Sequence, residues 1–119
     1  MTTLDYISVR KTFGSTVALE SFDLDVKEGE LITLLGPSGC GKTTALRITA
    51  GFEFADSGAV LVGGADITRT PAHKRNIGMV FQNYAIFPHL TVRENVEYGL
   101  QFRDLSKAEY AQRVDEMLT

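Results

Sequence analysis

The stretch "ELITLLGPSGCGKTTALRITAG", residues 30–51, joins an apolar run to a glycine-rich loop and then to helix-forming residues. Residues 31–35 are nearly all apolar, which predicts a strand buried on both faces, as in a parallel sheet. Residues 42–50 favour a helix, and Gly51 stands where a C-terminal cap is expected. The stretch therefore predicts a strand, a loop and a helix of an α/β fold.

The loop "GPSGCGKTT", residues 36–44, fits the phosphate-binding pattern G-x-x-x-x-G-K-[ST] completely. Its glycines let the backbone approach an anion, so that successive N–H groups form a nest at the start of the helix. Lys42 then contacts the terminal phosphates, and the Thr43 hydroxyl is the expected Mg²⁺ ligand. The alternative, a glycine-rich turn with a chance lysine, is disfavoured by the flanking strand and helix. The predicted contacts are Gly36, Pro37, Ser38, Gly39, Cys40, Gly41, Lys42, Thr43 and Thr44.

Other reactive side chains carry weaker signals. Cys40 is the single cysteine, which excludes an internal disulfide and fits a reducing compartment. A thiol at a helix N-terminus can be a nucleophile, but no His–Asp pair stands nearby, and a small residue tolerated in the loop is preferred. His73 and His89 lack metal partners at ligand spacing.

The segments around the loop show two kinds of periodicity. Alternation over 4–13 and over 17–26 predicts two half-buried strands, with Leu4, Tyr6 and Val9 on one face of the first and Phe22, Leu24 and Val26 on one face of the second. Turns are predicted at 28–29 and 63–64, a short strand at 59–62, and a second buried strand at 77–81. Two capping boxes, Thr91 with Glu94 and Ser106 with Glu109, predict two helices. Their expected apolar stripes are Val92, Val96 and Leu100, and Ala108, Ala111, Val114 and Leu118.

Bulk composition excludes some classes of function. The 119 residues are 44% hydrophobic and 23% charged, as in ordinary globular domains, and the net charge of −3 offers no basic field for nucleic acid. The N-terminus lacks the apolar core of a signal peptide. No apolar run approaches the roughly 18 residues that a membrane span requires.

Three stretches together resemble one family. Residues 10–51, the linking segment 52–68, and "RNIGMVFQNYAIFPHLTVRENVEYGL", residues 75–100, are similar to the ATPases of ATP-binding cassette (ABC) transporters. The resemblance implies an incomplete P-loop NTPase domain of α/β class with an antiparallel β subdomain, a P-loop strand and helix, a Q-loop strand and the start of a helical subdomain. The implied division is 1–30 and 59–70 for the β subdomain, 31–58 and 71–82 for the nucleotide-binding core, and 83–119 for the rest.

The resemblance also implies roles for residues outside the loop. Phe13 matches the aromatic residue that stacks on adenine, with Ala18 near it, although a strand residue packed in the core is an alternative. Gln82 matches the Q-loop glutamine, which reaches the Mg²⁺ shell or the attacking water; a polar residue ending a strand is its alternative. The implied cofactors are ATP and Mg²⁺.

The family resemblance implies partners as well. Residues 83–90, "NYAIFPHL", match the surface that meets the transmembrane permease subunits, unless Tyr84, Ile86 and Phe87 are buried loop anchors. A homodimer, an external solute-binding protein and a peripheral position on the cytoplasmic face of the membrane follow from the same resemblance. The sequence of this stretch is most similar to those of importers of polyamines, ferric iron or sugars.

Several parts of the family pattern are absent from these residues. No "LSGGQ" signature occurs, since "LSKAE" at 105–109 lacks the glycines; there is no Walker B Asp-Glu and no switch histidine. We therefore expect the N-terminal half of an ABC ATPase domain that does not hydrolyse ATP by itself, with its last helix ending in mid-element. The alternative is a non-catalytic module that binds nucleotide weakly or docks on a membrane partner. A GTPase or small-molecule kinase would need base-reading or lid motifs that the sequence lacks.

Overall fold

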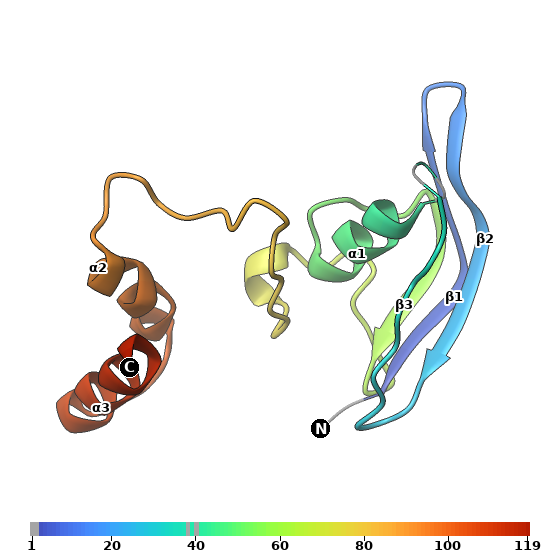
Figure 1. Cartoon of the computed structure of the whole chain (residues 1–119). Helices are drawn as coiled ribbons and strands as arrows, with labels where there is room; N and C mark the ends of the chain where they lie inside the picture. Colours follow the sequence, from blue (N-terminus) through green and yellow to red (C-terminus); the bar gives the residue numbers. More distant parts are fainter. Residues whose placement is uncertain (1–2, 38, 40) are drawn as a thin grey trace. The chain divides into compact units, whose positions relative to one another are not determined.

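The computed structural model describes residues 3–37, 39 and 41–119, and the chain folds as two compact units, Met1–Met79 and Val80–Thr119. The first unit holds a four-stranded sheet and helix α1 (Lys42–Ala50), and the second holds helices α2 (Val92–Glu97) and α3 (Lys107–Leu118) (Figure 1). In the described residues no helix combines the length and apolar character required to cross a bilayer.

The sheet is antiparallel throughout. Its strands are β1 (Leu4–Phe13), β2 (Thr16–Val26), β3 (Ser57–Val62) and β4 (Ala65–Asp66), in the order β2-β1-β3-β4. The long β1–β2 hairpin, drawn in blue, closes where Phe13 pairs with Thr16 (Figure 1). The predicted alternating strands and the turns at 28–29 and 63–64 are confirmed, and β3 begins two residues earlier than predicted.

A bulge in β1 explains why Tyr6 and Val9 are both buried although three residues separate them. The pairing register shifts between these residues, and Ser8 has a φ of 47°. A Cβ on Gly58, in the neighbouring strand, would lie 2.3 Å from the Ser8 carbonyl oxygen, and the φ of Gly58 is 85°. Only glycine fits opposite this bulge, because any side chain would collide with backbone.

The core of the first unit lies between the sheet and α1 (Lys42–Ala50). The Tyr6 hydroxyl is hydrogen-bonded to the Thr49 Oγ1 across this interface, and the Tyr6 ring packs edge-on against Phe22 at 5.0 Å. Gly51 adopts the left-handed conformation with a φ of 90° and caps the helix, as predicted. The buried cluster comprises Tyr6, Val9, Leu19, Ala45, Ile48, Ala55 and Val60.

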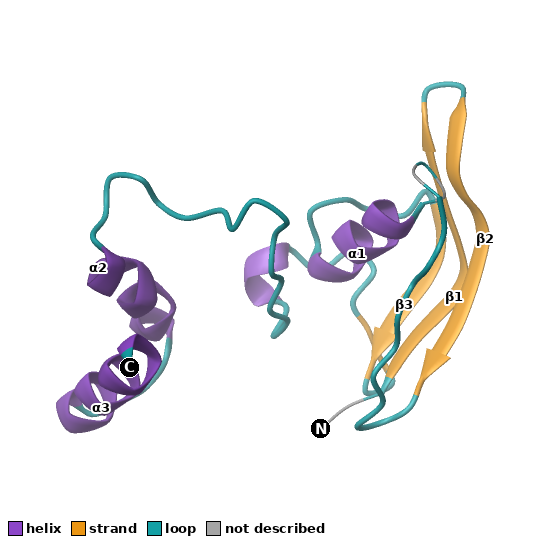
Figure 2. Cartoon of the chain, viewed as in Figure 1, coloured by secondary structure: helices purple, strands orange, loops and turns teal. Residues whose placement is uncertain are grey.

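Two predicted strands do not form. Residues 31–35 and 77–81 are loop, and Leu31, Leu35 and Val80 are 93%, 88% and 93% exposed (Figure 2). An apolar run becomes a strand only when a neighbour supplies its ladder hydrogen bonds, and none of the described strands pairs with either segment. The prediction of a buried strand was therefore wrong for both segments, as was the parallel pairing expected for 31–35.

The second unit contains α2 (Val92–Glu97), the 3-10 turn η2 (Tyr98–Phe102) and α3 (Lys107–Leu118); a further turn, η1 (Ala72–Lys74), lies in the first unit. Both predicted N-caps are present: the Thr91 hydroxyl accepts from the Glu94 N–H at 3.1 Å, and Ser106 with Glu109 forms a complete capping box.

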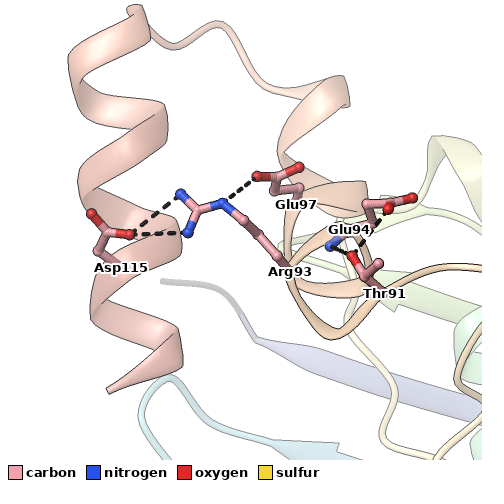
Figure 3. Close-up of polar contacts among 5 residues, drawn as sticks. All are labelled: Thr91, Arg93, Glu94, Glu97 and Asp115. Carbon is pink, nitrogen blue, oxygen red and sulfur yellow. Dashed lines mark hydrogen bonds and ion pairs between the residues drawn. The ribbon is translucent and has the colours of Figure 1, made fainter.

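The predicted apolar stripes of these helices are only partly correct. Val114 is fully buried, but Val92 is 73% exposed and Leu100 lies in η2 rather than in a continued helix. Ala108, Ala111 and Leu118 are also exposed. Arg93 joins α2 to α3 instead, since its guanidinium donates to Asp115 at 3.3 Å and its Nε lies 3.0 Å from Glu97 (Figure 3).

Candidate functional site

Within the glycine-rich loop, Gly41 is the N-cap of α1, which begins at Lys42. Gly41 has a φ of 95° and no side chain to cap the helix, and the first turn contains no acidic residue. The first N–H groups of a helix have no partner within it and carry its positive dipole end. This end of α1 is therefore suited to an anion.

Gly41 also touches the sheet directly. A Cβ at this position would lie 2.5 Å from the Ala18 carbonyl oxygen and 2.8 Å from the Leu19 Cδ2. Any larger residue would push the start of α1 away from β2. Glycine is required here by both conformation and space.

Lys42 links the two ends of the loop. Its Nζ donates to the Gly36 carbonyl oxygen, six residues earlier, and its side chain is half-buried. Thr43 is exposed. One ammonium group, a hydroxyl and a helix N-terminus thus gather at one turn, and this donor set fits a phosphate group. Ser38 and Cys40, also predicted to contact phosphate, lie outside the described residues.

A pocket of about 300 Å³ lies between α1, β2 and the apolar segment 31–35. Lys42 is the charged residue in its lining, and the other lining residues are mostly apolar, so this space is not the predicted phosphate cradle. It is lined by Leu19, Phe22, Thr33, Leu34, Leu35, Gly41, Lys42 and Ala45.

Phe13 is the last residue of β1, next to the turn that closes the β1–β2 hairpin. It pairs with Thr16 and is 46% exposed, which does not match the alternative of a core residue. Ala18, whose carbonyl contacts the Gly41 position, follows Thr16 by two residues on β2. Residues 16–19 of β2 therefore connect the start of α1 to the end of the strand that carries Phe13.

Sequence reasoning missed Arg75, which is 7% exposed. Its guanidinium donates to the carbonyl oxygens of Ile48 and Thr49 at 2.6 and 3.0 Å, at the C-terminus of α1, and to that of Thr70 at 2.7 Å. Burial lowers the pKa of Arg75. No local pattern signals this role, because the contacts span more than 25 residues.

Sequence reasoning also missed Lys11 and Asp56. The Lys11 Nζ lies 5.3 Å from the centroid of the Phe13 ring and 3.5 Å from an Asp56 oxygen. The one available signal was the spacing of Lys11 and Phe13, since residues two apart on a strand share a face.

Of the other predicted residues in the first unit, Pro37 and Gly39 are exposed and Thr44 is half-buried in α1. Gln82 and residues 83–90 lie in the second unit. Gln82 is exposed in a turn. Tyr84 and Ile86 are 81% and 70% exposed, whereas Phe87 packs on Tyr98 with ring centroids 4.5 Å apart. Residues 84 and 86 are therefore available for an interaction, and Phe87 anchors the loop.

Metal ligands of the usual cluster type are not found in the part of the chain that the structure describes. No group of three or more His, Cys, Asp or Glu side chains there is placed to hold an ion. Mg²⁺ bound with a nucleotide needs few protein ligands, because phosphate oxygens and water complete its shell. The exposed Thr43 hydroxyl is compatible with that arrangement.

Comparison with curated proteins reveals close similarity. The Fe(3+) ions import ATP-binding protein FbpC of Agrobacterium fabrum is 52% identical over 111 residues, which are 93% of this chain and 31% of that protein. The spermidine/putrescine import ATP-binding protein PotA of Aliivibrio fischeri is 50% identical over 110 residues, 92% of this chain and 30% of that protein. The chain thus spans about a third of the length of these relatives.

Solved structures and a family model agree with this similarity. The ATP-binding cassette MJ0796, in a post-hydrolysis dimer bound to ADP and Pi, superposes with a TM-score of 0.82 at 31% identity, over 95% of this chain and 54% of that chain. The family model described as ABC transporter matches residues 19–119. By this match, which covers most of its length, the chain belongs to the ABC transporter family.

Proposed function

We propose that this chain is the nucleotide-binding part of an ABC ATP-binding subunit and that residues 36–44 hold the phosphates of Mg-ATP. The observation that carries the proposal is the geometry of the loop. Gly41, at the start of α1, packs closely against the Ala18 carbonyl, and the Lys42 ammonium donates a hydrogen bond to the Gly36 carbonyl oxygen. Family membership favours ATP as the nucleotide.

Each residue then has a defined role. The N–H groups of residues 39–44 and the Lys42 ammonium hold the phosphates, and the Thr43 hydroxyl ligates Mg²⁺. Bound Mg²⁺ supplies positive charge against the β and γ phosphates. Phe13 stacks on the adenine, and Gln82 serves as the Q-loop glutamine toward Mg²⁺ or the attacking water. The subdomain boundaries given above are part of the same proposal.

The names of the relatives suggest the biological setting. FbpC and PotA are named for import of ferric ions and of spermidine or putrescine. We infer that this chain serves an importer of that kind, or of sugars, in which ATP binding and hydrolysis drive transport. It would work as a dimer on the cytoplasmic face of the membrane, touching permease subunits through residues 83–90, with a solute-binding protein outside.

Substituting Lys42 tests the phosphate site. Lys42→Ala is expected to weaken Mg-ATP binding about ten- to hundredfold, because a charge-assisted hydrogen bond contributes about 1.5–3 kcal/mol. Isothermal titration of the 119-residue chain measures the change. Lys27→Ala is the matched control, since it removes an exposed lysine paired with Asp25 at the end of β2. Equal affinity of Lys42→Ala and the parent chain would refute the site.

Substituting Phe13 tests the base site separately. Phe13→Ala is expected to weaken ATP binding about three- to tenfold, less than Lys42→Ala, because a stacked aromatic pair contributes about 0.5–1.5 kcal/mol. The same titration gives the value. An unchanged affinity would place the base elsewhere.

A further inference from the structure

The end of β1 that carries Phe13 extends beyond β3, one of the two strands that pair with β1. Strand β3 pairs with β1 as far as Arg10 and Ser57, so residues 11–13 have no β3 neighbour. Asp56, immediately before β3, replaces the missing ladder. Its N–H donates to the Arg10 carbonyl at 2.8 Å, and its Oδ2 accepts from the N–H and hydroxyl of Thr12 at 2.7 and 2.9 Å. One carboxylate therefore fixes the backbone next to Phe13.

The other oxygen of the Asp56 carboxylate forms an ion pair with Lys11. The Lys11 Nζ lies 3.5 Å from the Asp56 Oδ1 and 3.8 Å from the Glu53 Oε2, and the Lys11 side chain is only 14% exposed. This ammonium also stands over the Phe13 ring, 5.3 Å from its centroid. Cation and ring attract each other at this distance. The Lys11 ammonium is thus held between two carboxylates and one aromatic face.

An aromatic ring offers two faces, and here one of them is already covered. Lys11 takes one face of Phe13, while the residue as a whole remains 46% exposed. We propose that Lys11, held by Asp56 and Glu53, is a positioning residue that fixes the Phe13 ring so that a nucleotide base stacks on its open face. This inference rests on the proposed function, because it assumes that Phe13 meets the base.

The charges around Lys11 distinguish its role from that of Lys42. Two carboxylates neutralise the Lys11 ammonium, so it offers no excess positive charge to a triphosphate. Lys42, in contrast, contacts only a neutral carbonyl oxygen among the described interactions. Substituting Lys11 should therefore weaken binding of the base and leave binding of the phosphates unchanged.

Comparing two ligands, Mg-ATP and magnesium tripolyphosphate, separates base binding from phosphate binding. Titrating the 119-residue chain, we expect Lys11→Met to weaken ATP binding about two- to fivefold and to leave tripolyphosphate binding unchanged. Lys11→Arg, which keeps the cation over the ring, should preserve the ratio of the two affinities. Lys27→Met is the control for loss of a lysine. In a Phe13→Ala background, Lys11→Met should have no further effect on ATP.

The outcomes can be told apart. An unchanged ratio of ATP to tripolyphosphate affinity in Lys11→Met, with Lys42→Ala lowering both affinities, overturns this inference and leaves the phosphate site standing. A parent chain that binds neither ligand overturns both proposals. If circular dichroism shows that Lys11→Met is unfolded, Asp56→Asn decides: it keeps an acceptor for Thr12 but removes the charge that holds Lys11. A selective loss of ATP affinity in Asp56→Asn supports the inference, and an unchanged ratio overturns it.

Discussion

Tyr6 connects the sheet to α1, the helix that follows the glycine-rich loop. Its hydroxyl is hydrogen-bonded to the Thr49 Oγ1, which itself donates a hydrogen bond to the Ala45 carbonyl oxygen at 2.8 Å. Burial raises the pKa of Tyr6 to about 12, because the phenolate would lose its hydration in this core. A single ionisation would thus place a charge between β1 and α1.

Alkaline unfolding should report this ionisation. Because the pKa of Tyr6 is raised from 10.0 to about 12, the native state keeps a proton that the unfolded state loses, and stability falls as the pH rises from 10 toward 12. The loss amounts to about 2–3 kcal/mol. Urea unfolding at a series of pH values measures it. Tyr6→Phe should reduce the slope over this range; an identical slope in the variant would show that other groups cause it.

The packing of Gly41 against β2 can be tested by comparison with Gly39, which serves as a matched control. Both have a left-handed φ, 95° and 84°, but an added Cβ at Gly39 meets nothing within 4 Å whereas one at Gly41 meets the Ala18 carbonyl. Gly39→Ala should cost about 1 kcal/mol of unfolding free energy from backbone strain alone. Gly41→Ala should cost about 2 kcal/mol more because the start of α1 must move off β2. Urea unfolding of both variants tests this, and equal costs would contradict the packing described for Gly41.

Helix α1 is held at its C-terminus by a buried side chain from a later turn. Arg75 donates to the carbonyl oxygens of Ile48 and Thr49, which have no partner further along the helix. The same guanidinium donates to Thr70, so the connection after β4 closes onto α1. Arg75 therefore stabilises α1 at the end opposite the glycine-rich loop.

Removing this guanidinium should destabilise the first unit. Arg75→Met leaves buried carbonyl groups unpaired, and we expect a loss of about 2–4 kcal/mol in the free energy of unfolding. Chemical denaturation followed by far-UV circular dichroism measures the loss. Arg69→Met, at an exposed position of the same connection, should change stability by less than about 0.5 kcal/mol. Similar effects of the two substitutions would rule out a specific role for Arg75.

Elements with local signals were predictable from the sequence. Alternation defined β1 and β2, and the capping residues Thr91 and Ser106 marked the starts of α2 and α3. The runs at 31–35 and 77–81 were mispredicted because a strand depends on a neighbour that the segment itself does not encode.

The residues of the candidate site fall into the same two groups, those with a local sequence signal and those without one. The loop motif was recognisable from residue type and spacing, and Phe13 from the family resemblance. Lys11 with Asp56, and Arg75 with the end of α1, instead act across contacts of 26 to 45 residues. Such contacts follow from the sheet register and from the turn after β4. Neither the register nor this turn can be inferred from the local sequence.

For the chain as a whole, the residues proposed to hold a phosphate and those that would activate water are unequally represented. The described part places the Lys42 ammonium and the N-terminus of α1 at the loop. The 119 residues contain no apolar run followed by Asp-Glu, the pattern that supplies a general base in the family. We therefore expect ATP binding and ATP hydrolysis to be separable in this polypeptide.

We expect the purified 119-residue chain to bind Mg-ATP without hydrolysing it. Positioned phosphates gain little reactivity when no side chain orients or deprotonates the attacking water, since such proton transfer contributes about 10²- to 10⁴-fold to the rate. Phosphate release under saturating ATP measures turnover, and Lys42→Ala, purified in parallel, gives the background from contaminating ATPases. Release above that background would mean that a carboxylate among these residues already serves as the base. Substituting acidic residues one at a time would then identify it.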